Sequence, residues 1–261
     1  MKSRILVIVI QVPNSNRSNP LINALILSEN FEVNIFSAIM YRREMSEYKP
    51  NFEKHKLLYG RELSNGEVGC TISHWSVYQR YKSNYGTVVV LEDDARIPNM
   101  EEFEQVVFDF QNRYGKDNAV LSLLPWKGEK RRPHESRKLR RLIGHSPLTV
   151  GYVITRPAMK ELLFSNSDFS YLPDWPPSAT KFYITFGGVI DHGDSATFSV
   201  IDRNGRIKTR RYLGILHFLL ITYLRSPRTF RSFGEYWQSA IFPSFSWRID
   251  KFTMFVRRYF L

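Results

Sequence analysis

Short apolar runs alternate with amphipathic segments along the first 165 residues of the chain. Five runs rich in valine, isoleucine and leucine predict buried strands, because β-branched side chains pack well on a pleated sheet. These runs are residues 5–10, 31–39, 87–91, 119–124 and 150–155. Segments with a helical pattern lie between them, at 21–27, 68–82, 100–114 and 158–164. Strands that alternate with helices predict an α/β fold with a mostly parallel sheet.

Local signals define two of these helices more sharply. Ser64 and Glu67 have the spacing of a capping box, which starts a helix by pairing backbone N–H groups with side-chain oxygens. Gly86 is expected to end that helix before the next strand. The segment 41–59 is polar and irregular, so no element is predicted there. The helix at 100–114 has one apolar face, made of Phe103, Val106, Val107 and Phe110.

The character of the chain changes at about residue 206. An apolar run at 212–224 is flanked by arginines on both sides, and aromatic residues are frequent from there to the end. Such a run is too short to span a bilayer but suits its interface, where aromatic rings lie at headgroup depth and arginine contacts lipid phosphate. The alternative is a core helix with a solvated basic face. We therefore divide the chain into an α/β domain at 1–205 and a basic, aromatic, helical tail at 206–261.

Charge and composition narrow the class of protein. One cysteine among 261 residues excludes a disulfide framework and a thiolate metal cluster, and no run of about 18 apolar residues predicts a membrane-spanning helix. The net charge of +12 is concentrated in two segments of the chain. Residues 201–261 hold 12 basic and 3 acidic residues, and residues 127–141 hold 8 basic and 2 acidic residues. Local positive charge indicates a polyanionic partner, either a nucleic acid or an anionic membrane surface.

Three consecutive acids, Glu92, Asp93 and Asp94, follow the predicted strand at 87–91. Ligands of open α/β sheets bind at the carboxyl ends of strands. Three anions in that position repel one another unless solvent, protons or a cation compensate their charge. Carboxylate oxygens suit Mn²⁺ or Mg²⁺, which can stabilise a departing diphosphate. A solvated turn at the strand end is the alternative.

The region around these acids is similar to a known family. Residues 61–74 read RELSNGEVGCTISH and residues 88–95 read VVVLEDDA. Together they resemble the paired signature of glycosyltransferase family 25, which is close to L-t-x-G-E-i-G-C-x-x-S-H followed by i-L-E-D-D. Weaker similarity covers about residues 4–200, although Gln11 stands where the family usually has asparagine. The family contains bacterial lipooligosaccharide galactosyltransferases and collagen galactosyltransferases.

This resemblance implies a GT-A-like, Rossmann-type domain with a nucleotide-sugar donor, commonly UDP-galactose, a divalent metal and inversion at the anomeric carbon. By analogy with GT-A enzymes, Asp94 would bind the metal directly. Asp93 would also belong to the metal site, and Asp93 and Glu92 would lie near the ribose or metal-bound water. His192 would complete the metal shell, as a C-terminal histidine does in many GT-A enzymes. A loop residue with ordinary turn chemistry is the alternative for His192.

Four further residues have both a functional and a structural interpretation. His74 could contact the nucleotide or diphosphate, or could be a core histidine. Glu67 could accept from the donor, although capping explains it fully. Arg17 could pair with the donor phosphate, or could be an ordinary surface arginine. Cys70 is most simply a small buried apolar residue, since no activating partner is evident in the sequence.

An inverting transfer needs a carboxylate that takes the proton of the acceptor hydroxyl. This base should lie across the anomeric carbon from the diphosphate, hence on a later segment than the metal motif. Asp174 is our first candidate, with Trp175 beside it for stacking on a sugar ring, and Asp191 is the second. Turn and cap chemistry in proline- or glycine-rich loops is the alternative for both.

Together with the resemblance, these features predict a metal-dependent inverting glycosyltransferase that transfers a hexose, with galactose from UDP-galactose as the first choice, to a lipooligosaccharide or lipopolysaccharide acceptor. The tail would hold it at the cytoplasmic face of the inner membrane, on an anionic surface, close to a lipid-linked oligosaccharide. The basic loop at 127–141 could contact a phosphorylated lipid core. Two alternatives are a metal-dependent nucleic-acid-processing enzyme and a non-catalytic membrane-bound interaction protein. In the interpretation that we favour, the protein has no nucleic-acid partner.

Overall fold

We describe the protein from a computed structural model that defines residues 4–59, 61–124, 139–142, 149–173, 178–185 and 188–192. Three of the predictions fall outside these residues. They are the tail at 206–261, the basic loop at 127–141 except for its last three residues, and the loop with Asp174 and Trp175.

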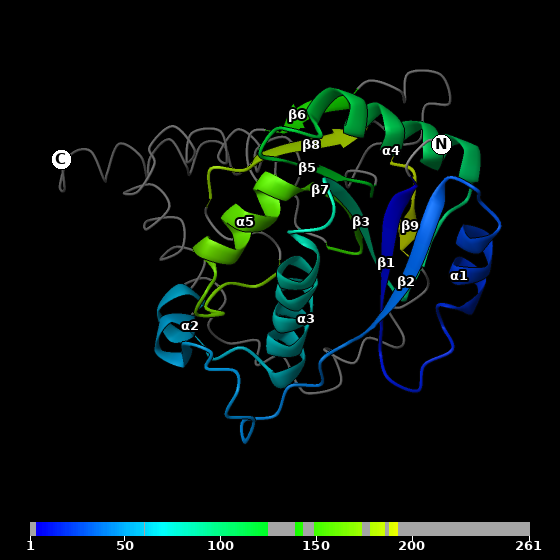
Figure 1. Ribbon diagram of the computed structural model, residues 1–261. Helices are drawn as coiled ribbons and strands as arrows, with labels where there is room; N and C mark the ends of the chain where they lie inside the picture. The colour runs from blue at the N-terminus through cyan, green and yellow to red at the C-terminus, as the bar shows by residue number, and fades with distance from the viewer. Residues whose placement is uncertain are drawn as a thin grey trace, which may run out of the picture.

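A central sheet organises the described part of the chain (Figure 1). Its strands lie in the order β2-β1-β3-β7-β5-β8-β6. Their bounds, in that order, are Phe31–Ser37, Ile5–Gln11, Thr87–Glu92, Gly151–Thr155, Ala119–Ser122, Lys181–Thr185 and Leu139–Leu142. Strands β2, β1, β3, β5 and β8 run in one direction, whereas β7 and β6 run the opposite way. The predicted α/β fold with a mostly parallel sheet is therefore confirmed, with two reversed strands that the sequence did not indicate.

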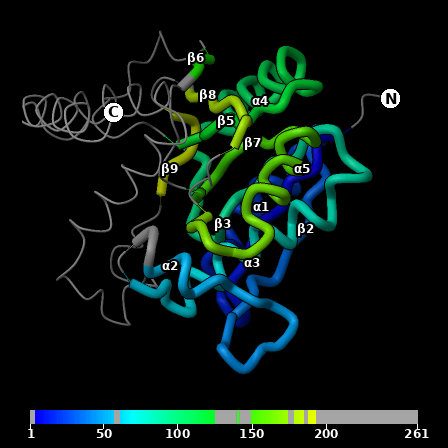
Figure 2. Tube along the Cα trace, turned by 90° about the vertical axis from the view of Figure 1, so that its left-hand side faces the viewer, coloured from blue at the N-terminus to red at the C-terminus, as the bar shows by residue number. Residues whose placement is uncertain are grey.

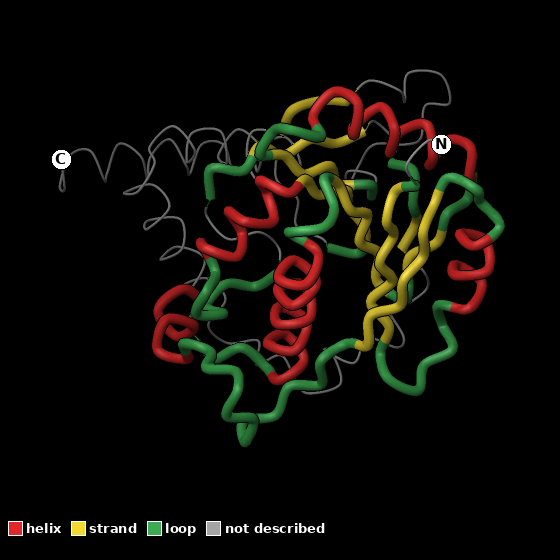
Figure 3. The backbone as a smooth tube through the Cα atoms, in the orientation of Figure 1, coloured by secondary structure: helices red, strands yellow, loops and turns green. Residues whose placement is uncertain are grey.

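Helices cover both faces of this sheet, as Figure 3 shows. Helices α1 (Asn19–Ile26) and α4 (Met100–Tyr114) cover the sheet face that carries the odd-numbered side chains of β1, whereas α3 (Asn65–Tyr81) and α5 (Arg156–Ser165) cover the face that carries the even-numbered ones. Burial on both faces explains why the strands are continuous apolar runs. The apolar face of α4 is buried as predicted.

Several elements differ from the sequence prediction. Helix α3 ends at Tyr81, one turn before Gly86, because the chain leaves the helix through Lys82 and a short turn. The polar segment 41–59 contains helix α2 (Phe52–Tyr59), which lacks a strong apolar stripe and packs beside the start of α3 through the cluster around Phe169 (Figure 2). Two short strands, β4 (Ala95–Arg96) and β9 (Asp191–His192), form a second sheet.

The close approach of α3 to the segment 39–41 requires a glycine. A methyl group at Gly69 would overlap the carbonyl oxygen of Ile39, whereas a methyl group at Gly86 would meet no atom within 4 Å. We expect Gly69→Ala to lower the free energy of unfolding by about 1–2 kcal/mol, because overpacking outweighs the helix propensity gained. Gly86→Ala should be neutral or slightly stabilising. Urea denaturation of both variants tests this, and equal midpoints would contradict it.

Candidate active site

A pocket of about 240 Å³ opens at the carboxyl ends of β1 and β3. Its walls are the chain after β1, the segment 38–41, the first half of α3 and the acids at 92–94. The parallel pairing of β1 with β3 sets Ile10 beside Glu92, so both strands deliver their following loops to the same edge. The acidic strand end predicted from sequence therefore borders a cavity at the position where α/β folds bind ligands.

Asp93 is held by the loop that follows β1. Its Oδ1 accepts from the Arg17 guanidinium at 2.5 Å, and its Oδ2 accepts from the backbone N–H of Val12 at 3.3 Å. The Asp93 side chain is only 4% exposed, whereas Arg17 is 33% exposed and also borders the pocket. Asp93 and Arg17 are thus brought together as an ion pair, and both oxygens of Asp93 already have a donor.

Asp94 has a different environment. Its Oδ1 is buried and has no hydrogen-bond partner among the described residues, and its Oδ2 lies 3.6 Å from Nε2 of His192. Burial, and then the charge of Glu92, raise the pKa of Asp94 above its usual value. A buried carboxylate oxygen without a donor is costly, so this oxygen suits a bound cation. The β4–β9 pairing places Ala95 opposite His192 and so brings this histidine to Asp94.

Glu92 is tied to His74 rather than to the other two acids. Its Oε1 accepts from Nε2 of His74 at 3.1 Å and from the hydroxyl of Thr149 at 2.8 Å. Burial alone would raise the pKa of Glu92, but the interactions with His74 and Thr149 outweigh it and lower that pKa. The ionised carboxylate only accepts, so Nε2 of His74 carries the proton.

The other ring nitrogen of His74 continues this network into the core. Nδ1 lies 2.7 Å from the hydroxyl of Tyr152, which lies 2.7 Å from the hydroxyl of Tyr78. Burial raises the pKa of both tyrosines, so both hydroxyls stay protonated. His74 is 2% exposed, yet it borders the pocket. His74 is therefore both a buried core histidine and a residue of the candidate site.

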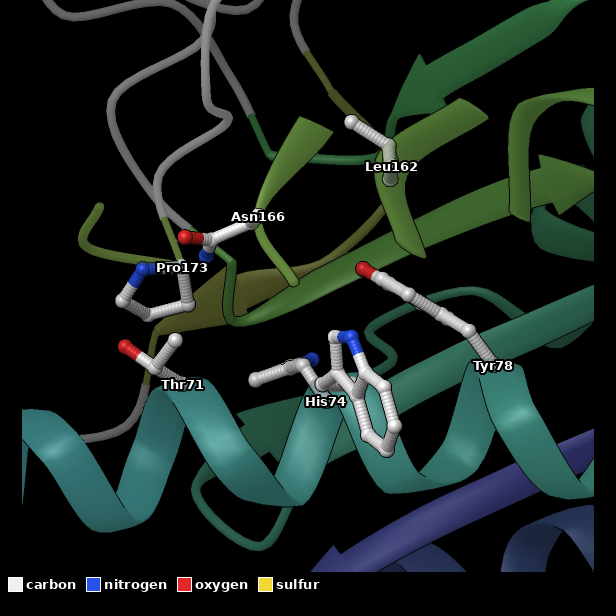
Figure 4. A pocket seen from close by; sticks show the side chains of 7 residues that line it. Thr71, His74, Tyr78, Leu162, Asn166 and Pro173 are labelled. Carbon is white, nitrogen blue, oxygen red and sulfur yellow. The ribbon is translucent and has the colours of Figure 1, made fainter. Parts of the chain in front are cut away.

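A second, much smaller cavity lies behind His74. Its volume is about 20 Å³, and Thr71, His74 and Tyr78 line it together with Leu162, Asn166 and Pro173 (Figure 4). That volume holds about one water molecule and no sugar. The large pocket is therefore the candidate substrate site.

Glu67 belongs to the start of α3 and does not border the large pocket. The capping box with Ser64 is present, and Arg61 donates to both carboxylate oxygens at 2.8 and 2.6 Å. Burial would raise the pKa of Glu67, but the hydrogen bonds from Arg61 and Ser64 lower it. The capping interpretation is confirmed, and we do not include Glu67 in the donor site.

Replacing Glu67 with alanine should therefore affect stability and not substrate binding. We expect the free energy of unfolding to fall by about 1–2 kcal/mol at neutral pH, because a capping interaction and a half-exposed ion pair are lost. The folded-state pKa is depressed, so this contribution is present above the ordinary value of 4.5 and is lost as the pH falls through the folded pKa. Urea denaturation at neutral and acidic pH measures it. A variant that is equally stable but binds donor poorly would contradict the assignment.

Of the two candidate bases, the structure describes Asp191 but not Asp174. Asp191 lies on β9 and is half-buried, but successive strand residues alternate in direction, so we expect it to face away from His192 and Asp94. Asp174 lies outside the described residues, one position after Pro173. Its role as base stays a prediction.

Sequence reasoning did not assign roles to Tyr152 and Thr149. Both come from the segment that begins at Thr149 and continues as β7, which lies between β3 and β5. Tyr152 lies within a predicted strand, and a large polar residue in an otherwise apolar run is the signal that could have marked it.

Within the part of the chain that the structure describes, no helix combines the length and apolar character needed to cross a bilayer.

Comparison with known proteins agrees with the sequence motifs. Residues 5–174 match the model of the family described as glycosyltransferase family 25 (LPS biosynthesis protein). The lipooligosaccharide biosynthesis protein lic2B of Haemophilus influenzae is 24% identical over 143 residues, which cover 51% of this chain and 53% of that protein. A glycosyltransferase 25 family member of Anopheles gambiae is 33% identical over 111 residues, 40% of this chain and 18% of that protein. The chain thus spans about half, or less, of the length of these curated relatives.

Among solved structures, the crystal structure of A197 from STIV overlaps 73% of this chain and 85% of that chain. Its sequence identity is 14% and its TM-score is 0.39, so this overlap bears on neither fold nor function.

Proposed function

The chain belongs to glycosyltransferase family 25, and from this premise we propose that it transfers a hexose from a nucleotide-sugar donor to an oligosaccharide acceptor of lipopolysaccharide or lipooligosaccharide. UDP-galactose is the proposed donor and Mn²⁺ or Mg²⁺ the proposed cofactor. The domain is proposed to be GT-A-like, and the transfer to invert the anomeric carbon.

One observation carries this proposal, namely the buried carboxylate of Asp94 at the border of the large pocket. Its Oδ1 has no donor among the described residues, and His192 lies beside its Oδ2. An aspartate oxygen and an imidazole nitrogen are ligands that Mn²⁺ accepts, so the residues present fit the ion. When bound, a divalent ion neutralises the charge that develops on the departing diphosphate.

The remaining acids would support Asp94 rather than share its role. Asp93 is proposed to hold Arg17 and the loop after β1 against the pocket, because both of its oxygens are engaged there. Glu92 is proposed to fix the end of β3 through His74 and Thr149. We therefore assign direct coordination to Asp94 and His192, with Asp93 and Glu92 as positioning residues.

Acceptor activation and membrane attachment are proposed for residues outside the described ranges, with the exception of Asp191 on β9. Asp174 is proposed as the base that takes the proton of the acceptor hydroxyl, with Asp191 as the second candidate. The tail at 206–261 is proposed to attach the protein to the anionic cytoplasmic face of the inner membrane, next to the lipid-linked acceptor.

A donor screen tests the proposal. We expect one UDP-sugar, and UDP-galactose first, to be hydrolysed slowly or transferred in the presence of Mn²⁺, and EDTA to abolish this activity. Restoring Mn²⁺ after EDTA should recover it. If no UDP-sugar binds and EDTA changes nothing, the proposed donor and the metal dependence are both wrong.

A further inference from the structure

Three side chains of different chemistry meet in the wall of the large pocket. One ligand atom each of Cys70, His74 and Glu92 lies within 4.8 Å of the other two. Cys70 and His74 are four residues apart on α3, so they lie on the same face one turn apart, and Glu92 ends the adjacent strand β3. All three residues line the pocket, which gives an ion a path from solvent.

The distances between these ligand atoms are close to those around a small cation with tetrahedral coordination. The Sγ atom of Cys70 lies 3.9 Å from Oε1 of Glu92, and Nε2 of His74 lies 3.1 Å from the same oxygen. Zinc bonds of about 2.0–2.3 Å in tetrahedral geometry separate neighbouring ligand atoms by roughly 3.5 Å. The third pair, Cys70 with His74, lies within 4.8 Å, so a side-chain shift of up to about 1 Å would bring the three ligand atoms to this spacing.

The surroundings hold two of the ligands in place. The Nδ1 atom of His74 is fixed by the hydroxyl of Tyr152 at 2.7 Å, and Glu92 is fixed by the hydroxyl of Thr149 at 2.8 Å. Histidines that bind metals usually donate a hydrogen bond from their second ring nitrogen, which sets the orientation of the ring, and the Tyr152 hydroxyl oxygen is in place to accept one once the proton lies on Nδ1. The same side chains thus have a supported ligand geometry before any ion binds.

We propose that Cys70, His74 and Glu92 form a binding site for Zn²⁺ or a chemically similar cation. This site is separate from the proposed metal site at Asp94 and His192. A thiolate and an imidazole favour Zn²⁺ over Mg²⁺ and Mn²⁺. On binding, the thiol proton of Cys70 is released to solvent, and the ring proton of His74 moves from Nε2 to Nδ1, from which it donates a hydrogen bond to the hydroxyl oxygen of Tyr152. Because all three residues line the large pocket, the occupied site would border it.

The single cysteine makes this site easy to observe. We would titrate the 261-residue protein with Co²⁺, a spectroscopic substitute for Zn²⁺, in a buffer without competing thiols. We expect a near-ultraviolet thiolate-to-cobalt band and intense visible bands of four-coordinate cobalt, both removed by Zn²⁺. Because the chain has one cysteine, the ultraviolet band reports Cys70 alone. Absence of this band would overturn the proposal.

Two variants separate this site from the proposed donor site. Glu92→Gln should weaken the cobalt affinity about tenfold or more, because a charged ligand is lost. Asp94→Asn should keep the thiolate band and its affinity, even if it abolishes sugar transfer. A band with unchanged affinity in Glu92→Gln would overturn the three-residue site.

A measurement on the unaltered protein covers the case in which Glu92→Gln does not fold. Zinc X-ray absorption should show one sulfur and at least one imidazole around the ion. A shell of oxygen and nitrogen alone would overturn the proposal. None of these readouts needs a sugar donor, so their failure would leave the proposed transferase activity to its own test.

Discussion

Replacing Asp94 with asparagine is expected to abolish Mn²⁺-dependent sugar transfer while the folded chain stays as stable as before or becomes more stable. Asparagine has the same shape but removes the negative charge proposed to hold the metal. Loss of several kilocalories per mole of transition-state stabilisation corresponds to a rate lower by about a thousandfold. Stability should not fall, because the variant removes a buried carboxylate whose Oδ1 has no donor among the described residues.

Asp117→Asn is the matched control for this experiment. The side chain of Asp117 is 46% exposed and, among the described residues, pairs with Lys181 at the surface at 3.9 Å, so its variant should retain both activity and stability. Transfer rates at saturating donor and thermal denaturation should be measured for both variants. Activity of Asp94→Asn within about twofold of the original protein would remove Asp94 from the proposed metal site.

Replacing Arg17 with alanine is expected to have the second-largest effect, on stability and activity together. It leaves the carboxylate of Asp93, 4% exposed, without its cation. Removing one partner of a fully buried pair costs about 3–5 kcal/mol, and Arg17 is one-third exposed, so we expect about 2 kcal/mol. Transfer should also fall, since the loop after β1 borders the pocket beside Asp94.

A double variant identifies the cause of that loss. Adding Asp93→Asn to Arg17→Ala should recover part of the stability, because the unpaired charge is removed as well. Arg113→Ala serves as the surface control, because Arg113 contacts Asp109 at 3.8 Å and is 55% exposed, and should change stability by about 0.5 kcal/mol or less. Urea midpoints measure all three. Equal effects of Arg17→Ala and Arg113→Ala would show that the Arg17–Asp93 pair has no special importance.

Several site residues could be recognised from sequence only as separate candidates. Asp94 and His192 are far apart in the chain, and they lie 3.6 Å apart because β4 pairs with β9. Strands of two residues are too short for a sequence pattern to predict this pairing. Arg17 could be interpreted from sequence either as a partner of the donor phosphate or as an ordinary surface arginine. The structure pairs it with Asp93 at the border of the pocket, and a contact with donor phosphate stays a prediction. Which of two nearby anions an arginine contacts depends on loop geometry, which residue spacing does not encode.

The sequence by itself determined the features that depend on neighbouring residues. The capping box at Ser64, the apolar face of α4 and the acids that end β3 follow from local backbone and side-chain preferences. The family motifs around Glu67 and Asp94 were likewise legible in the chain alone.

Only the tertiary structure decided that β7 runs against β3 and lies between β3 and β5. A strand buried on both faces is a continuous apolar run in either direction, so its pattern carries no information about direction or neighbour. That placement brings Tyr152 and Thr149 to His74 and Glu92, and it therefore creates the hydrogen-bonded wall of the pocket. Many candidate site residues could therefore be identified from the sequence, whereas the contacts between them depend on how strands distant in the sequence pack together.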